Sequence, residues 1–116
     1  MRRVVICSPW RGDTALHARY LDACLADSYR RGEAPIAAHA IGPRVLREEI
    51  EEERARGIQA GLAWIRCADA LVVYVDLGIS EGMVREAEEA RAHGIPIEER
   101  SLGGEWAQAA GEVRRG

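Results

Sequence analysis

Residues 70–75 of the chain, ALVVYV, form an unbroken apolar run that is rich in β-branched residues. A strand that is apolar on both faces is typical of the middle of a parallel sheet, because helices cover both faces there. A second run of this kind, RVVIC at residues 3–7, is ended by Ser8-Pro9. Weaker runs at residues 34–38 and 95–97 predict two further short strands. The chain is therefore expected to build a sheet around the strands at residues 3–7 and 70–75.

The segments between the predicted strands have helical patterns with recognisable ends. A helix over residues 14–31 begins at a capping residue and ends before Gly32, and one over residues 80–93 begins at Ser80 and ends before Gly94. Strands and helices thus alternate along the chain. This alternation predicts an α/β fold, a small Rossmann-like three-layer sandwich with a mostly parallel sheet of four to five strands.

The segment between the second and third predicted strands is harder to interpret. Pro43 suits the first turn of a long helix that begins near Arg44. Gly57 and Gly61 weaken the middle of this helix, so a break is expected there before residues 62–65 return to the core.

Length and composition place the chain among single globular domains. It has 116 residues, of which 47% are hydrophobic and 30% charged, so one domain over residues 1–100 is expected, with a weakly helical or disordered tail over residues 101–116. All sixteen cations are arginines and the net charge is −3. No basic cluster suits a nucleic acid polymer, and the absence of lysine excludes a P-loop or a Schiff base.

The cysteines and the first residues give further expectations. Cys7, Cys24 and Cys67 form no short Cys-x-x-Cys pair, so they are interpreted as small core residues. The first apolar run is too short for a signal peptide or a membrane span. A cytoplasmic location without a membrane partner is therefore expected.

Ligands of open α/β sheets bind beyond the carboxyl ends of the strands, so the residues that follow each predicted strand are candidate site residues. The loop over residues 8–13 leads into a helix N-terminus, where free amides and the Arg11 guanidinium can bind an anion such as phosphate, and Gly12 lets the backbone approach it. The alternative is an ordinary helix entry with Arg11 paired to a surface acid.

Glu86 shares a helical face with Met83 and Ala90, and that face is expected to look toward the sheet. An ionised glutamate in such a place can attack an electrophilic sugar carbon and form a covalent intermediate. The alternative is a partly exposed glutamate that pairs with Arg85 or Arg91.

His39 follows the second predicted strand, where it can donate to phosphate or act as an acid near neutral pH, although a lone loop histidine often does neither. Trp10 can stack on a base. His17 and His93 have no partner at a metal-ligand spacing, so no metal site is predicted.

Three stretches together resemble the nucleoside 2-deoxyribosyltransferase superfamily, which includes the deoxynucleoside 5′-monophosphate N-glycosidases. They are residues 5–13, residues 62–73 and residues 80–90, the last of which is similar to the signature S-x-G-x-x-x-E-x-x-x-A. The likeness spans about residues 3–98. The amino-acid sequences of the first and last stretches resemble even more closely those of short bacterial and phage domains of the same superfamily. No established reaction is associated with those domains.

The resemblance implies an N-glycosidic hydrolase or transferase that acts on a nucleotide or nucleoside without a cofactor. It implies that Glu86 is the nucleophile, that Ser80 and Gly82 hold the 5′ end of the ligand, and that Arg11 and Gly12 lie near a 5′-phosphate. The candidate catalytic residues are Glu86 and His39, and the candidate substrate-binding residues are Ser8, Trp10, Arg11, Gly12, Asp13, Asp76, Ser80, Gly82 and Met83.

Two departures from the superfamily pattern keep a second hypothesis open. Pro9 stands where the monophosphate-specific branch carries a serine, and Gly61 stands where active members carry an aspartate that helps to protonate the departing base. The alternative is a nucleotide-binding module, a sensor or sequestering protein, with weak or no chemistry. A homodimer is expected in either case, because a four-stranded sheet leaves the pocket edges open and the superfamily usually closes them with a partner subunit.

Overall fold

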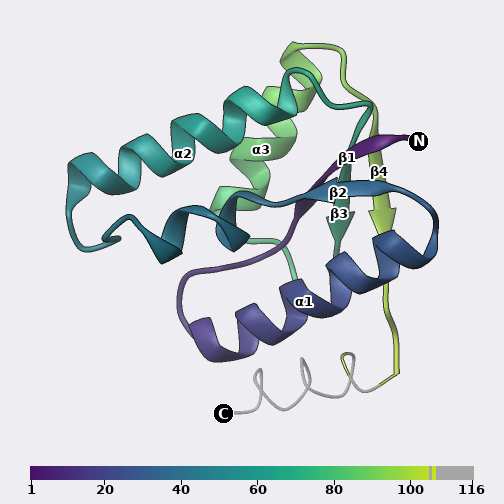
Figure 1. Cartoon of the computed structure of the whole chain (residues 1–116), viewed down its shortest axis with the longest axis horizontal. Helices are drawn as coiled ribbons and strands as arrows, with labels where there is room; N and C mark the ends of the chain where they lie inside the picture. The colour runs from purple at the N-terminus through teal and green to yellow at the C-terminus, as the bar shows by residue number, and fades with distance from the viewer. Residues whose placement is uncertain (105, 107–116) are drawn as a thin grey trace.

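The computed structural model describes residues 1–104 and 106. Its elements follow one another as β1 (Arg3–Cys7), α1 (Thr14–Arg30), β2 (Ala34–Ile36), the 3-10 turns η1 (Ala38–Ala40) and η2 (Gly42–Arg44), α2 (Glu51–Ile65), β3 (Ala70–Tyr74), α3 (Glu81–Ala92) and β4 (Ile97–Arg100). α1 covers one face of the sheet, and α2 and α3 cover the other (Figure 1). The predicted α/β three-layer fold class is confirmed.

The sheet is parallel throughout and has the strand order β2-β1-β3-β4. β1 and β3 pair side by side in the centre, and every residue of β3 is buried. Successive residues alternate between the two cores, as the pleat of a strand requires. Val72 and Tyr74 pack in the core beneath α1, whereas Leu71 and Val73 pack beneath α2 and α3. The continuous apolar run of β3 thus serves both faces.

The cysteine prediction holds for Cys7 and Cys24, which are buried, and is wrong for Cys67, which is exposed just after α2. Cys67 lies in the turn between α2 and β3, and its thiol donates to the Trp64 carbonyl at 3.4 Å. Its position in a connecting turn, where no element covers it, explains the difference.

The segment before α2 also differs from the prediction. The helix expected from near Arg44 is absent there, since Gly42–Arg44 form the short turn η2, and α2 begins only at Glu51. Pro43 lies inside η2, where its fixed φ suits a tight turn. The three glutamates Glu51–Glu53 complement the positive end of the α2 dipole and favour a helix start at that point.

Gly57 and Gly61 do not break α2, contrary to the sequence prediction. A Cβ at Gly61 would lie 3.0 Å from the Ala38 Cβ, and one at Gly57 would lie 3.3 Å from a terminal methyl of Leu46. Glycine costs a helix about 1 kcal/mol relative to alanine. Here it lets α2 approach the turns that follow β2, and that packing keeps the helix continuous.

Replacing these two glycines by alanine is expected to have opposite effects. Gly61→Ala should lower the free energy of unfolding by about 1 kcal/mol, because the Ala38 Cβ lies on a turn and can move away only with its backbone. Gly57→Ala should be neutral or stabilising, because the Leu46 methyl can rotate aside and alanine favours the helix. Urea unfolding of both variants measures the difference. Equal stabilisation by both would show that α2 and η1 are not held in close contact.

The two outer strands are shifted from their predicted ranges. β2 ends at Ile36 rather than residue 38, because η1 begins at Ala38. β4 was predicted at residues 95–97 and lies at Ile97–Arg100. Pro96 has no N–H for the ladder, so pairing starts at its carbonyl, which accepts from the Leu71 N–H at 2.9 Å.

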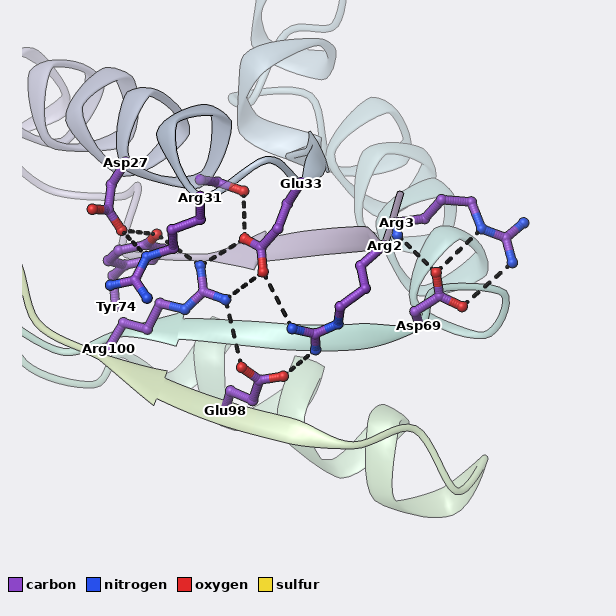
Figure 2. Close-up of polar contacts among 10 residues, drawn as sticks. Arg2, Arg3, Asp27, Arg31, Glu33, Asp69, Tyr74, Glu98 and Arg100 are labelled. Atoms are coloured by element: carbon purple, nitrogen blue, oxygen red, sulfur yellow. Dashed lines mark hydrogen bonds and ion pairs between the residues drawn. The ribbon is translucent and has the colours of Figure 1, made fainter.

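A buried polar network, which sequence reasoning did not identify, joins β4 to the residue just before β2, near the last turns of α1 (Figure 2). The Arg100 guanidinium donates to both oxygens of Glu33 at 2.7 and 2.6 Å, and both side chains are 7% exposed. The Ser28 hydroxyl donates to Glu33 at 2.9 Å, and the Tyr74 hydroxyl donates to Asp27 at 2.7 Å. The Arg100 hydrogen bond lowers the pKa of Glu33 to about 2. The pair is therefore fully ionised at neutral pH.

The segment after β4 is held by Asp76. Its carboxylate accepts from the Ser101 hydroxyl at 2.6 Å and from the Leu102 and Gly103 N–H groups at 2.9 Å, and Trp106 packs on Tyr20 with ring centroids 5.2 Å apart. The tail predicted over residues 101–116 lies largely outside the described residues, and the domain boundary at residue 100 stays a prediction. Within residues 1–104 and 106, no helix combines the length and apolar character needed to cross a bilayer.

Candidate functional site

A pocket of about 440 Å³ opens beyond the carboxyl end of β1, between the turns after β2, one face of α2 and the first turns of α3. This volume is typical of small-molecule sites. The structure brings together around it most of the side chains that the sequence singled out, namely Ser8, Trp10, Arg11, Gly12, His39, Ser80, Gly82, Met83 and Glu86. Asp13 and Asp76 do not line it.

Both of these aspartates have partners within the protein. Asp13 is the N-cap of α1, where its carboxylate accepts from the Leu16 N–H at 3.1 Å. Asp76 follows β3 but turns toward α1, where it accepts from the Tyr20 hydroxyl at 2.7 Å and holds the segment after β4. A position after a strand places a residue at the correct end of the sheet but does not determine which face its side chain takes.

The β1–α1 loop supplies a cation and a glycine with positive φ at the pocket. Arg11 is exposed, and it has no ion pair with any residue that the structure describes. Gly12 has φ +92°, a conformation that other residues rarely adopt, and its carbonyl accepts from the Thr14 N–H at 2.9 Å. The loop therefore presents a guanidinium next to the N-terminus of α1, an arrangement suited to an anion.

Trp10 and His39 form one wall of the pocket. Their rings are stacked with centroids 5.4 Å apart and planes 10° from parallel. Burial, with a smaller contribution from the charge of His17, lowers the pKa of His39 to about 4. His39 is therefore neutral at pH 7, where it can offer one ring N–H to a ligand.

The N-terminus of α3 forms another wall of the pocket. The Ser80 hydroxyl accepts from the Met83 N–H at 3.3 Å, which makes Ser80 the N-cap that the sequence predicted. A Cβ at Gly82 would meet only the Ser80 hydroxyl, at 3.9 Å. The backbone at Gly82 is therefore open to the pocket, and a ligand can approach it closely.

Glu86 lies on α3 after the open turn at Gly82, on the same side as the buried Met83 and Ala90. Its side chain is half-buried at the pocket. Burial raises the pKa of Glu86 to about 7, although the neighbouring Cys7 thiol and the charge of Arg85 lower it. Burial also raises the pKa of Cys7, so that thiol is neutral.

The ion-pair alternative for Glu86 is not what the structure shows. Among the described residues, Glu86 has no arginine within salt-bridge distance, and Glu89, one turn further along α3, pairs with Arg66 at 2.7 Å instead. With its pKa raised to about 7 by burial, the Glu86 carboxyl is accessible in both protonation states near neutral pH. Such a group can act as a nucleophile or exchange a proton.

Apart from Gly61, which the superfamily resemblance places at the position of an aspartate, the rest of the lining comes from residues that were not among the candidate site residues. The apolar and small residues are Ala38, Gly42, Pro43, Leu46, Gly57, Ile58, Gly61 and Leu62, and the charged residues are Glu48, Glu53, Arg54, Glu81 and Arg85. Gly57 and Gly61, four residues apart on α2, are a second signal, since they mark a helix face that other residues approach closely. In the described part of the chain no three His, Cys, Asp or Glu side chains are grouped to hold a metal ion.

Comparisons with known proteins identify a family and a shared fold. The model of a family described as a domain of unknown function, DUF7768, matches residues 2–100. Among solved structures, the chain is similar to 2-deoxyribosyltransferase from the psychrotolerant bacterium Bacillus psychrosaccharolyticus, with 15% sequence identity and a TM-score of 0.69. The likeness covers 88% of this chain and 74% of that one, and at this identity it shows a shared fold. No curated protein sequence matches the chain.

Proposed function

This chain belongs to the DUF7768 family, and we propose that it cleaves the N-glycosidic bond of a nucleoside 5′-monophosphate or nucleoside, with Glu86 as nucleophile. One observation carries the proposal. A half-buried carboxyl whose pKa is raised to about 7 shares one pocket with the arginine and the glycine of the β1–α1 loop. That combination suits a ligand with an anionic end and an electrophilic carbon.

The proposed reaction has two displacements. A Glu86 carboxylate oxygen bonds to C1′ of the sugar while the bond from C1′ to the base breaks, and the base leaves with the electron pair and takes up a proton. Water or a second base then attacks C1′ and releases the carboxylate. Arg11 and the N-terminal amides of the helices hold the phosphate, so that the sugar lies over α3.

A nucleotide-binding module without efficient chemistry is the second candidate. It is favoured by Gly61, which carries no acid at the α2 position where the superfamily resemblance expects one, and by His39, which is neutral at pH 7. A positioned general acid contributes about 10²–10⁴-fold to such reactions. An enzyme that lacks one is expected to be slow.

Release of free base distinguishes the two candidates. The purified protein is incubated with a panel of nucleosides and 5′-monophosphates, and the products are separated by chromatography. An enzyme releases base from at least one of them. Confirmed binding of a monophosphate with no release of any base would support the binding module.

Arg11→Ala is expected to weaken the binding of 5′-monophosphates by about tenfold or more and to leave nucleosides nearly unchanged. A charge-assisted bidentate contact contributes about 1.5–3 kcal/mol, and only the phosphorylated ligand makes it. Calorimetric titration of both ligand types measures the effect, with Arg19→Ala, an exposed arginine of α1 outside the pocket, as the matched control. Equal losses of affinity for monophosphate and nucleoside would mean that Arg11 does not contact the phosphate.

A homodimer remains part of the proposal. Large apolar side chains next to the pocket lining are exposed, among them Ile41, Val45 and Ile79. A partner subunit that covers them would also close the pocket mouth.

A further inference from the structure

Ser8 has an unusual hydrogen-bonding state. The residue is 2% exposed, and its hydroxyl oxygen is buried without a partner among the residues that the structure describes. Buried polar groups are nearly always hydrogen-bonded, so an unpaired one needs an explanation. Ser8 also lines the pocket. A ligand bound there is therefore a natural partner for the hydroxyl.

The position of Ser8 indicates which part of the ligand it meets. It directly follows Cys7, the last residue of β1, whose thiol neighbours the Glu86 carboxyl. Consecutive Cα atoms are about 3.8 Å apart, so Ser8 belongs to the Glu86 end of the pocket. Arg11, the proposed phosphate ligand, lies three residues further along the loop.

Stereochemistry then identifies the ligand group. The nucleophile that displaces a β-linked base approaches C1′ from the opposite face of the sugar ring. In ribose that face carries the 2′- and 3′-hydroxyls. Groups that surround the Glu86 carboxyl are therefore placed to meet these hydroxyls rather than the base.

We propose that the Ser8 hydroxyl hydrogen-bonds a sugar hydroxyl on the face that Glu86 attacks, and so selects for ligands that carry that hydroxyl. The inference rests on the proposed function, because it assumes that a nucleoside or nucleotide occupies the pocket. A site built to pair with a ligand hydroxyl discriminates against analogues that lack it, since its own polar group is then left unpaired.

The first arm of the test uses the unliganded protein. Ser8→Ala removes a buried hydroxyl without a partner, so the melting temperature should be unchanged or raised. Ser28→Ala is the matched control, because Ser28 is also a buried serine but its hydroxyl donates to Glu33, and this variant should melt at a lower temperature. If Ser8→Ala lowers the melting temperature as Ser28→Ala does, the hydroxyl has a structural role and the inference fails.

The second arm measures binding by calorimetry. The ligands share one base and are the ribonucleoside 5′-monophosphate, its 2′-deoxy and 2′,3′-dideoxy forms, and the ribonucleoside. Ser8→Ala should weaken the ribonucleotide about three- to tenfold and the dideoxy form not at all. The effect of Ser8→Ala on the affinity for the 2′-deoxy form shows whether Ser8 contacts the 2′- or the 3′-hydroxyl.

Two results would overturn the inference while leaving the proposed function in place. One is that Ser8→Ala changes the affinity for all the monophosphates equally, or changes it for none of them. The other is that Ser8→Ala weakens binding of the ribonucleotide but not of the unphosphorylated ribonucleoside, which would mean that the Ser8 hydroxyl contacts the phosphate. Failure of every ligand to bind the wild-type protein would instead refute the proposed function, and this inference with it.

Discussion

Replacing Glu86 by glutamine is expected to slow base release from the best 5′-monophosphate by at least about 10³-fold, with little change in its dissociation constant. Glutamine keeps the shape and the hydrogen-bonding reach of the side chain but has no carboxylate to attack C1′. Glu88→Gln is the matched control, because Glu88 is an exposed glutamate on the same helix. A glutamine variant at position 86 that turns over at the wild-type rate would exclude Glu86 as the nucleophile.

The raised pKa of Glu86 predicts how this effect depends on pH. Only the ionised carboxylate attacks, so kcat/KM should rise as the pH increases through about 7 and level off above it. The folded-state pKa lies above the ordinary value of 4.5, so burial favours the protonated form. The contribution of the protonated form to the free energy of unfolding is fully present below pH 4.5 and is lost as the pH rises through about 7.

Glu86→Gln should therefore raise the free energy of unfolding at pH 8, by an amount on the order of 1–3 kcal/mol. The gain should vanish near pH 3, well below the ordinary value of 4.5, because the wild-type glutamate is then neutral in both the folded and the unfolded state. Urea unfolding at the two pH values measures it. A pH-independent difference would mean that the carboxyl is not buried as described.

Replacing Arg100 by methionine is expected to lower the free energy of unfolding by about 3–5 kcal/mol. The substitution leaves the Glu33 carboxylate buried without its bidentate partner, at 7% exposure, and it breaks the link between β4 and the start of the segment that forms β2. The loss is large for a domain whose whole stability is about 5–15 kcal/mol. Denaturant unfolding followed by circular dichroism measures it.

Glu98→Gln provides the comparison for this network. Glu98 also contacts Arg100, at 3.5 Å, but its side chain is 39% exposed, so the loss should be below about 1 kcal/mol. The pKa of Glu33 is lowered to about 2, so the stability from its ionised form is present above pH 4.5 and is lost as the pH falls toward 2. A cost for Arg100→Met no larger than that for Glu98→Gln would contradict this account of the buried pair.

The central part of the fold could be predicted because it depends on local patterns. The apolar run of β3 indicates burial on both faces, and Ser80 marks the start of α3 because its hydroxyl can cap the helix. The start of α2 was mispredicted, because Pro43 is compatible with the first turn of a helix and with a 3-10 turn. Only packing against the rest of the molecule distinguishes these two.

The candidate site was predictable to the extent that it lies at strand ends. That rule led to Arg11 and His39, and helical periodicity led to Glu86. The strand-end rule could not separate Asp76, whose side chain turns toward α1, from the residues that face the pocket. The Arg100–Glu33 pair joins residues 67 positions apart, and no local pattern indicates such a contact.

The stereochemistry of the released sugar tests the nucleophilic role of Glu86 most directly. The protein is incubated with a reactive 5′-monophosphate in dilute methanol, and the anomer of the methyl glycoside 5′-phosphate is assigned by nuclear magnetic resonance. Two displacements through a covalent bond to Glu86 retain configuration, so the account predicts the β-methyl glycoside. The α-methyl glycoside would mean direct attack on C1′ by the solvent, with no bond to Glu86, and would contradict the mechanism.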